Sequence, residues 1–292
     1  MLQLLLGGSG SGKTTLLYQR IRARAEKGEK SILLVPEQFT SSTEGRIYRE
    51  LGDALSGMVE SFSFTSLAEK ILSTEGGAAV QTLSDAGRAV LVRRALEELQ
   101  DNVHYYHRHR RSAAFCQMAA QTIDELKSAG LSGQQLAQLA GACGAESGKL
   151  SELALIFQGY ETLLARSGMD PSDRLELAGA RLEEALARHS LPEFLRDRAV
   201  FIDEFDTFNA PKKRLLGAML AALPSVTVAL CDDGAPLLPG DLSLFSGAKQ
   251  VAAQLRQLAR KNGAEVAVPQ LLRKDLRHRN APGLAAVAEL LE

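Results

Sequence analysis

The chain has 292 residues, of which 45% are hydrophobic, so it can bury the core of one or two domains without covalent crosslinks. Its 34 Lys and Arg side chains are balanced by 35 Asp and Glu, which excludes a strong attraction of the whole molecule to nucleic acid or to an anionic membrane. The three cysteines are widely spaced, and no apolar stretch approaches the roughly 20 residues that span a bilayer. We therefore expect a soluble protein of the reducing cytoplasm, without a disulfide framework or a zinc site.

Short apolar runs bounded by turn or charged residues predict six buried strands. They lie at residues 2–6, 31–35, 58–62, 199–202, 226–231 and, more weakly, 265–268. Several of these runs show little alternation of apolar and polar residues, which is typical of strands covered on both faces of a parallel sheet. The sequence therefore predicts an α/β fold, with a parallel sheet flanked by helices.

A long segment between the third and fourth strands is rich in Ala, Leu, Gln and Glu at helical spacing. One helix is predicted in KLSELALIFQGYETLLARSG and ends at Gly168; the next has Asp170 as its N-cap and Pro171 as its first residue, and runs to about His189. We predict an all-helical insertion at 69–189 in an α/β core formed by 1–68 and 190–269, followed by the start of a further, truncated region at 270–292.

The stretch LLLGGSGSGKTT joins the first predicted strand to an amphipathic helix. The pattern G-x-x-x-x-G-K-[ST] of phosphate-binding loops (P-loops) is matched by Gly7, Gly12, Lys13 and Thr14. In such loops backbone N–H groups surround the phosphate oxygens, the lysine reaches the β- and γ-phosphates, and the hydroxyl meets Mg²⁺. The residues predicted to bind ATP are Gly7, Gly8, Ser9, Gly10, Ser11, Gly12, Lys13, Thr14 and Thr15. The alternative is a glycine-rich turn without a ligand.

A second part of this site is predicted after the fourth strand, in AVFIDEFDTF. A nucleotide-bound magnesium ion needs a carboxylate at the end of another buried strand. Asp203 is the predicted ligand, together with Thr14, and Glu204 is placed to orient or deprotonate an attacking water. Lys13, Asp203 and Glu204 are thus the candidate catalytic residues, and an acidic strand end without a ligand is the alternative.

The order of these segments resembles the N-terminal part of superfamily 1 helicases of the UvrD type. LLVPEQFT at 33–40 and FIDEFDTFNAPKKRLL at 201–216 resemble most closely the AddB (RexB) family of subunits of bacterial AddAB helicase-nucleases. The resemblance implies a RecA-like P-loop lobe, a role in processing double-strand breaks for DNA repair and recombination, and an AddA-like partner subunit that carries the main motor. It also implies that the chain is an N-terminal fragment, without the opposing lobe's arginines or the nuclease domain, so that hydrolysis would be slow.

The resemblance places Gln38, Phe39, Thr40, Ser61 and Ser63 on segments that contact single-stranded DNA in motor members of the superfamily. A separate candidate is HYYHRHRR, in which tyrosines could stack on bases while Arg108, Arg110 and Arg111 meet phosphates. The alternatives are an ordinary β-to-α loop and a polar strand end for the first group, and a solvated loop or helix start for the second. RKDLRHR at 273–279 is a further basic stretch that could face DNA, and loss of a partner domain would explain it equally well.

Two departures from the motor pattern leave the activity open. Motor members place an adenine-reading glutamine ahead of the P-loop, whereas Gln3 lies inside the first strand, so adenine selectivity is unsupported. Asp232 and Asp233 stand where motor members have a γ-phosphate-sensing glutamine. A nucleotide-binding scaffold without turnover is therefore the main alternative to an ATP-hydrolysing lobe. A small-molecule P-loop kinase is a further one, although a large helical insertion is unlike that class.

Overall fold

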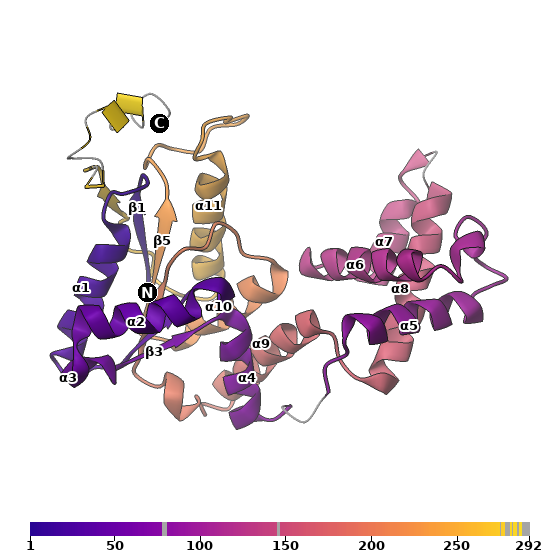
Figure 1. The fold of residues 1–292 in the computed structure, drawn as a ribbon, viewed down its shortest axis with the longest axis horizontal. Helices are drawn as coiled ribbons and strands as arrows, with labels where there is room; N and C mark the ends of the chain where they lie inside the picture. Colours follow the sequence, from indigo (N-terminus) through magenta and orange to yellow (C-terminus); the bar gives the residue numbers. More distant parts are fainter. Residues whose placement is uncertain are drawn as a thin grey trace. The chain divides into compact units, whose positions relative to one another are not determined.

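The computed structural model describes residues 1–77, 81–144, 147–274, 276, 277, 281, 283, 284, 286 and 287. The chain divides into two compact units (Figure 1). The α/β unit consists of Met1–Glu75, Gly179–Phe208 and Lys213–Glu292, and the helical unit of Gly76–Ala178 and Asn209–Lys212. The truncated region predicted at 270–292 lies partly outside the described residues.

The α/β unit contains one sheet in which every strand pairing is parallel. Its order is β3-β2-β4-β5-β1-β6. The strands are β1 (Leu2–Gly7), β2 (Ser31–Leu34), β3 (Val59–Phe62), β4 (Ala199–Ile202), β5 (Ser225–Cys231) and β6 (Gln270–Leu272). The α/β class and the parallel sheet predicted from the apolar runs are confirmed, with the first five strands within about a residue of their expected ends.

The sixth strand is not where the sequence predicts it. In the predicted segment at 265–268 only Val266 pairs, through an isolated bridge to Leu2, and Val268 is 86% exposed. The strand itself begins after Pro269 and pairs Gln270 with Leu5. Proline has no N–H to donate to a ladder, so it interrupts the pairing along β1 and shifts the regular strand towards the C-terminus.

Helices cover both faces of the sheet. The unit contains α1 (Lys13–Ala25), η1 (Glu37–Phe39), α2 (Thr40–Leu51), α3 (Asp53–Ser56), α4 (Phe64–Glu75), η4 (Glu193–Leu195) and α11 (Ser246–Lys261). Alternate strand residues, Leu5, Leu33 and Phe201 among them, form one cluster with apolar residues of α1 and α2. Leu4 and Leu6, which point the other way, are equally buried, and Figure 1 shows β1 and β5 between α1 and α11. This two-sided burial explains the uninterrupted apolar runs.

The helical unit has a core of its own, built from α5 (Asp85–Glu98), α6 (Ala113–Ser128), α7 (Gly133–Ala140) and α8 (Ser147–Ser167). Serine hydroxyls cap three of these helices: Ser84 and Ser112 accept the N–H groups of Gly87 and Phe115, and Ser132 forms a capping box with Gln135. Two further helices, α9 (Pro171–Ala187) and α10 (Ala210–Ala222), pass from one unit into the other. No helix among the described residues is both long and apolar enough to cross a bilayer.

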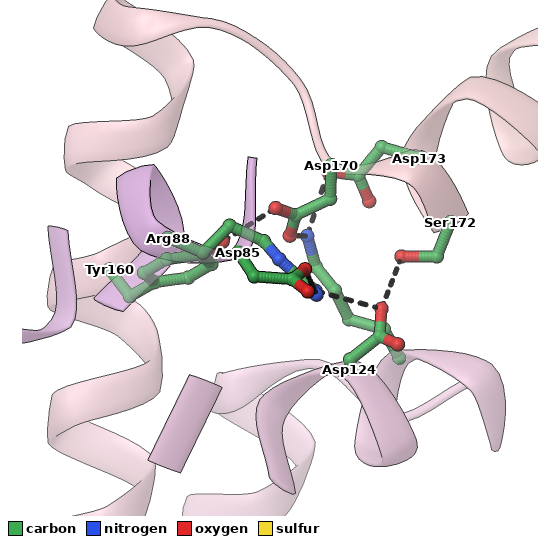
Figure 2. Close-up of polar contacts among 8 residues, drawn as sticks. Asp85, Arg88, Asp124, Tyr160, Asp170, Ser172 and Asp173 are labelled. Atoms are coloured by element: carbon green, nitrogen blue, oxygen red, sulfur yellow. Dashed lines mark hydrogen bonds and ion pairs between the residues drawn. The ribbon is translucent and has the colours of Figure 1, made fainter. Parts of the chain in front are cut away.

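The connection from α8 to α9 contains a buried polar network (Figure 2). Asp170 directly precedes α9 as predicted, and its carboxylate accepts hydrogen bonds from the Tyr160 hydroxyl at 2.5 Å and from Lys127 Nζ at 2.8 Å. Lys127 Nζ also donates to Asp173 at 2.7 Å. Burial alone lowers the pKa of Lys127, but its hydrogen bonds to the two aspartates outweigh burial and raise it. The Asp170 carboxylate, which the sequence predicts as the N-cap of α9, therefore forms a buried ion pair with Lys127.

Candidate functional site

The loop between β1 and α1 is held in a conformation that two glycines make possible. A Cβ on Gly7 would lie 2.4 Å from Ser11 Oγ and 2.6 Å from the carbonyl oxygen of Leu272. Gly12 caps α1 with a φ of 90°, in the left-handed region that side chains disfavour. The Ser11 hydroxyl is buried without a hydrogen-bond partner among the described residues. The loop is thus a tight backbone cradle ahead of a helix N-terminus, with one polar atom left unpaired.

Lys13, the first residue of α1, folds its side chain back over this loop. Its Nζ donates hydrogen bonds to the carbonyl oxygens of Gly7 at 2.6 Å and Gly8 at 2.8 Å. A lysine without a local role would extend its ammonium into solvent. Here the ammonium is instead partly buried at the mouth of the cradle.

The structure brings Thr14 of α1 and Asp203, which follows β4, together. The Thr14 side chain hydrogen-bonds the Asp203 carboxylate, which also accepts the N–H of Glu204 at 3.0 Å. Burial raises the pKa of Asp203, and the hydrogen bond from Thr14 opposes that rise. A hydroxyl and a carboxylate held in contact form the oxygen donor pair that Mg²⁺ prefers.

Glu204 has an unusual backbone for a non-glycine residue. Its φ is 63°, in the left-handed region, and it lies two residues after the buried end of β4. Such a conformation carries strain and is enriched at functional sites. Burial and the neighbouring Asp203 charge both raise the pKa of Glu204, whereas Arg46 lowers it. The side chain is therefore a better proton acceptor than an exposed glutamate.

These groups line one cavity of about 550 Å³ in the α/β unit. Its lining includes the predicted residues Ser9, Gly10, Gly12, Lys13, Thr14, Thr15, Asp203 and Glu204. Among the described residues, no three His, Cys, Asp or Glu side chains gather as a metal site on their own. A magnesium ion would therefore be held by Thr14 and Asp203 together with the phosphates of a nucleotide. The cradle, the unpaired hydroxyl and the oxygen donors fit such a group.

The residues predicted to contact DNA in the α/β unit lie in or after two neighbouring strands. Gln38 and Phe39 belong to η1 and Thr40 begins α2, all beyond the carboxyl end of β2. Ser61 lies in β3, which pairs with β2 in parallel. Ser63, in contrast, is buried, and its hydroxyl accepts the N–H of Ser66 at 3.1 Å as a cap for α4. Its hydroxyl is therefore occupied within the fold.

The basic stretch in the helical unit is an ordered loop. The buried carboxylate of Glu152 accepts hydrogen bonds from the backbone N–H groups of His104, Tyr105 and Tyr106, at 2.7–3.2 Å. Tyr105 is 57% exposed, and Arg108 and Arg111 are exposed as well. Arg110 is half-buried and donates to the His107 carbonyl. The loop thus presents cations and a ring on a fixed backbone.

Arg46 of α2 lines the same cavity as the predicted residues, but sequence reasoning missed it. Its guanidinium carbon lies 4.9 Å from the ring centre of Tyr18 in α1. Burial, more than any charge, raises the pKa of Tyr18 to about 12, so the ring stays neutral and can stack with a cation. No motif marks Arg46, because its position depends on how α2 packs against α1. Its place beside the buried Ile47 is the only local signal.

Together these features define an α/β protein with a candidate site at the carboxyl ends of parallel strands, where such sheets commonly bind ligands. The family model described as "ADDB, N-terminal" matches residues 4–288. The chain therefore belongs to the AddB N-terminal family, and the resemblance stated from the sequence is confirmed.

Proteins named as one subunit of an ATP-dependent helicase/deoxyribonuclease are similar to this chain over nearly its full length. The protein from Desulforudis audaxviator is 34% identical over 97% of the chain, and that from Moorella thermoacetica is 33% identical over 97%. The protein from Symbiobacterium thermophilum is 31% identical over 99%. The chain spans about a quarter of the length of these relatives, namely 25%, 25% and 26%.

Proposed function

We propose that this chain is the ATP-binding, RecA-like region of a helicase-nuclease subunit that acts in DNA double-strand break repair and recombination. The contact between Thr14 and Asp203 carries the proposal, because it joins the glycine-rich loop to a carboxylate from a distant strand inside one cavity. In this proposal Lys13 binds the β- and γ-phosphates, Thr14 and Asp203 hold Mg²⁺, and Glu204 orients the attacking water. Magnesium would supply charge neutralisation at the phosphates.

Calorimetric titration of the chain with ATP and MgCl₂ tests this proposal. Lys13→Ala should weaken binding at least about tenfold, since a hydrogen bond to a charged group contributes about 1.5–3 kcal/mol. Arg49→Ala is the matched control, because Arg49 is an exposed cation of α2 that does not line the cavity. Absence of ATP binding by the unaltered chain, at millimolar nucleotide, would sink the proposal.

A non-hydrolysing scaffold remains the second candidate function. The carboxylates of Asp232 and Asp233 accept the N–H groups of Gly234 and Ala235, at 2.7 and 2.8 Å. Asp233 also forms an ion pair with Lys249 of α11 at 3.2 Å, so both carboxylates are engaged by groups of the protein itself. Release of phosphate from ATP, measured with and without single-stranded DNA, separates the two functions. Slow turnover that DNA accelerates supports the first, and binding without turnover supports the scaffold.

We further propose that the protein binds single-stranded DNA through two surfaces. One consists of Gln38, Phe39, Thr40 and Ser61 in the α/β unit, and the other is the loop at 104–111 in the helical unit. Fluorescence anisotropy with labelled oligo(dT), measured over a series of salt concentrations, tests the loop. Each phosphate contact that is lost should reduce the slope of the logarithm of the binding constant against the logarithm of salt concentration by about 0.7 for a single strand. Arg108→Ala with Arg111→Ala should show that reduction. Arg93→Ala with Arg94→Ala, which removes two exposed arginines of α5, is the matched control.

The relatives carry the name of one subunit of a larger enzyme, which supports the proposal that an AddA-like partner completes the assembly. We place this assembly in the cytoplasm, where the unpaired Cys116, Cys143 and Cys231 would stay reduced.

A further inference from the structure

Arg46 supplies a positive charge to the acidic side of the cavity. It reaches the cavity from α2, whereas Lys13 bonds the loop carbonyls and Arg277 donates to Ser9 Oγ, both on the loop side. The charge of Arg46 lowers the pKa of both Asp203 and Glu204, which shows that it lies within electrostatic range of the two carboxylates. The acidic wall of the cavity therefore has a cation of its own.

The guanidinium of Arg46 nevertheless lacks a polar partner in the described part of the chain. It makes no hydrogen bond or ion pair with any residue that the structure describes, and its recorded contact is the face of the Tyr18 ring. A guanidinium carries five N–H donors in a planar fork, and stacking on a ring leaves the edges of that fork free. The side chain is thus held in place by a contact that uses none of its donors.

An incoming triphosphate would need such a cation. Asp203, Glu204 and Asp206 all line the cavity, so the terminal phosphate of ATP would otherwise approach several carboxylates in a partly enclosed space. The planar fork of arginine matches two phosphate oxygens at once.

We propose that Arg46 is a phosphate-binding residue that contacts the γ-phosphate of ATP from within the same chain. This inference rests on the proposed nucleotide binding and extends it to selectivity for the triphosphate. The Tyr18 ring acts as a positioning group, because it holds the guanidinium without consuming its donors.

The test compares the affinities of the full chain for ATP and for ADP, each with MgCl₂, by calorimetry. Arg46→Ala should weaken ATP binding about 10- to 100-fold, as expected for loss of a charge-assisted bidentate contact. ADP binding should change by less than about fivefold, the range of a screened charge at a distance. Arg46→Lys should fall between the wild type and Arg46→Ala for ATP, since it keeps the charge and loses the fork.

Three further variants separate loss of the phosphate contact from loss of folding. Tyr18→Phe keeps the ring and should leave the ratio of ATP to ADP affinity unchanged, whereas Tyr18→Leu should lower that ratio in the same direction as Arg46→Ala. Arg49→Ala, one turn further along α2, should leave both affinities unchanged. Circular dichroism of every variant confirms that α2 and the sheet remain folded.

If the wild-type chain binds both nucleotides and Arg46→Ala leaves the ratio of ATP affinity to ADP affinity unaltered, the role of Arg46 is overturned. The proposed function then still stands. An equal loss for ATP and ADP also overturns it, because a γ-phosphate contact cannot weaken ADP. A wild-type chain that binds neither nucleotide overturns both this inference and the proposed function.

Discussion

The Lys127–Asp170–Tyr160 cluster of the helical unit and the cavity of the α/β unit differ in how their polar groups are paired. In the helical unit, Lys127, Asp170 and Tyr160 bind one another, so a buried cation and a buried anion are matched within the fold (Figure 2). At the cavity of the α/β unit, Ser11 Oγ is buried and the half-buried Arg46 lies against the Tyr18 ring, and neither group has a polar partner among the described residues. Matched groups of the first kind maintain a structure, whereas unmatched ones beside a cavity are typical of a site that receives a ligand. The comparison yields four predictions, from the largest expected effect to the smallest.

Exchange of Lys127 for methionine should cause the largest loss of stability. It leaves Asp170 buried without its cation, and breaking a buried ion pair costs about 3–5 kcal/mol. Urea denaturation followed by circular dichroism measures the change in free energy of unfolding. Arg93→Met is the control, because it removes an exposed pair with Glu97 and should cost less than about 1 kcal/mol. An equal loss of unfolding free energy in both variants would mean that the buried ion pair of Lys127 stabilises the fold no more than the exposed pair of Arg93.

Glu152→Gln should loosen the basic loop of the helical unit. Three backbone N–H groups now share two carboxylate oxygens, and an amide offers them one oxygen and an unwanted donor. We expect a loss of about 1–3 kcal/mol, the cost of leaving buried donors unsatisfied. Amide hydrogen exchange at His104, Tyr105 and Tyr106 should accelerate at the same time. Unchanged exchange at these amides would mean that the carboxylate does not hold the loop.

Asp203→Asn should have the opposite sign and stabilise the ligand-free chain by up to about 2 kcal/mol, as substitutions at functional sites often do. Burial raises the native pKa of Asp203 above its usual 3.8, so the native state binds this proton more tightly than the unfolded state does. That contribution to stability is present below about pH 3.8 and is lost as the pH rises through the native pKa.

The thermal midpoints of wild type and Asp203→Asn should therefore diverge as the pH rises from about 3.8 through the raised native pKa of Asp203. The same variant should lose its magnesium-dependent ATP binding. Glu60→Gln, an acid of the same sheet outside the cavity, provides the comparison for binding. If the thermal midpoint of Asp203→Asn is instead lower than that of the wild type at neutral pH, the Asp203 carboxylate stabilises the fold, as the Asp170 carboxylate does.

Ser63→Ala should have the smallest effect, a loss of about 1 kcal/mol from the missing helix cap. Because the Ser63 hydroxyl is buried in that cap, affinity for oligo(dT) should stay at the wild-type value. Gln38→Ala, at an exposed position after β2, is the contrasting variant and should weaken DNA binding. Weaker DNA binding by Ser63→Ala, at equal helix content, would contradict the assignment of this serine to the fold.

Much of the fold follows from short-range patterns. Five strands lie where apolar runs end in turn residues, and α8 ends at Ser167, one residue before Gly168. The sixth strand was misplaced because Val266 and Val268 look like a strand, while Pro269 decides where the ladder can continue. Asp170 was correctly placed before α9, but its carboxylate serves Lys127 and Tyr160, which come from other helices.

The amino-acid sequence by itself determined the glycine-rich loop, the lysine and threonine after it, the acids after the fourth strand, and membership of the AddB N-terminal family. These features depend on neighbouring residues, since spacing and backbone freedom are local properties. Only the tertiary structure decided that Thr14 meets Asp203, that Tyr18 holds Arg46, and that Ser63 is buried. A parallel sheet brings together strand ends and helix faces that are far apart in the chain, and no local pattern records which side chains then come into contact.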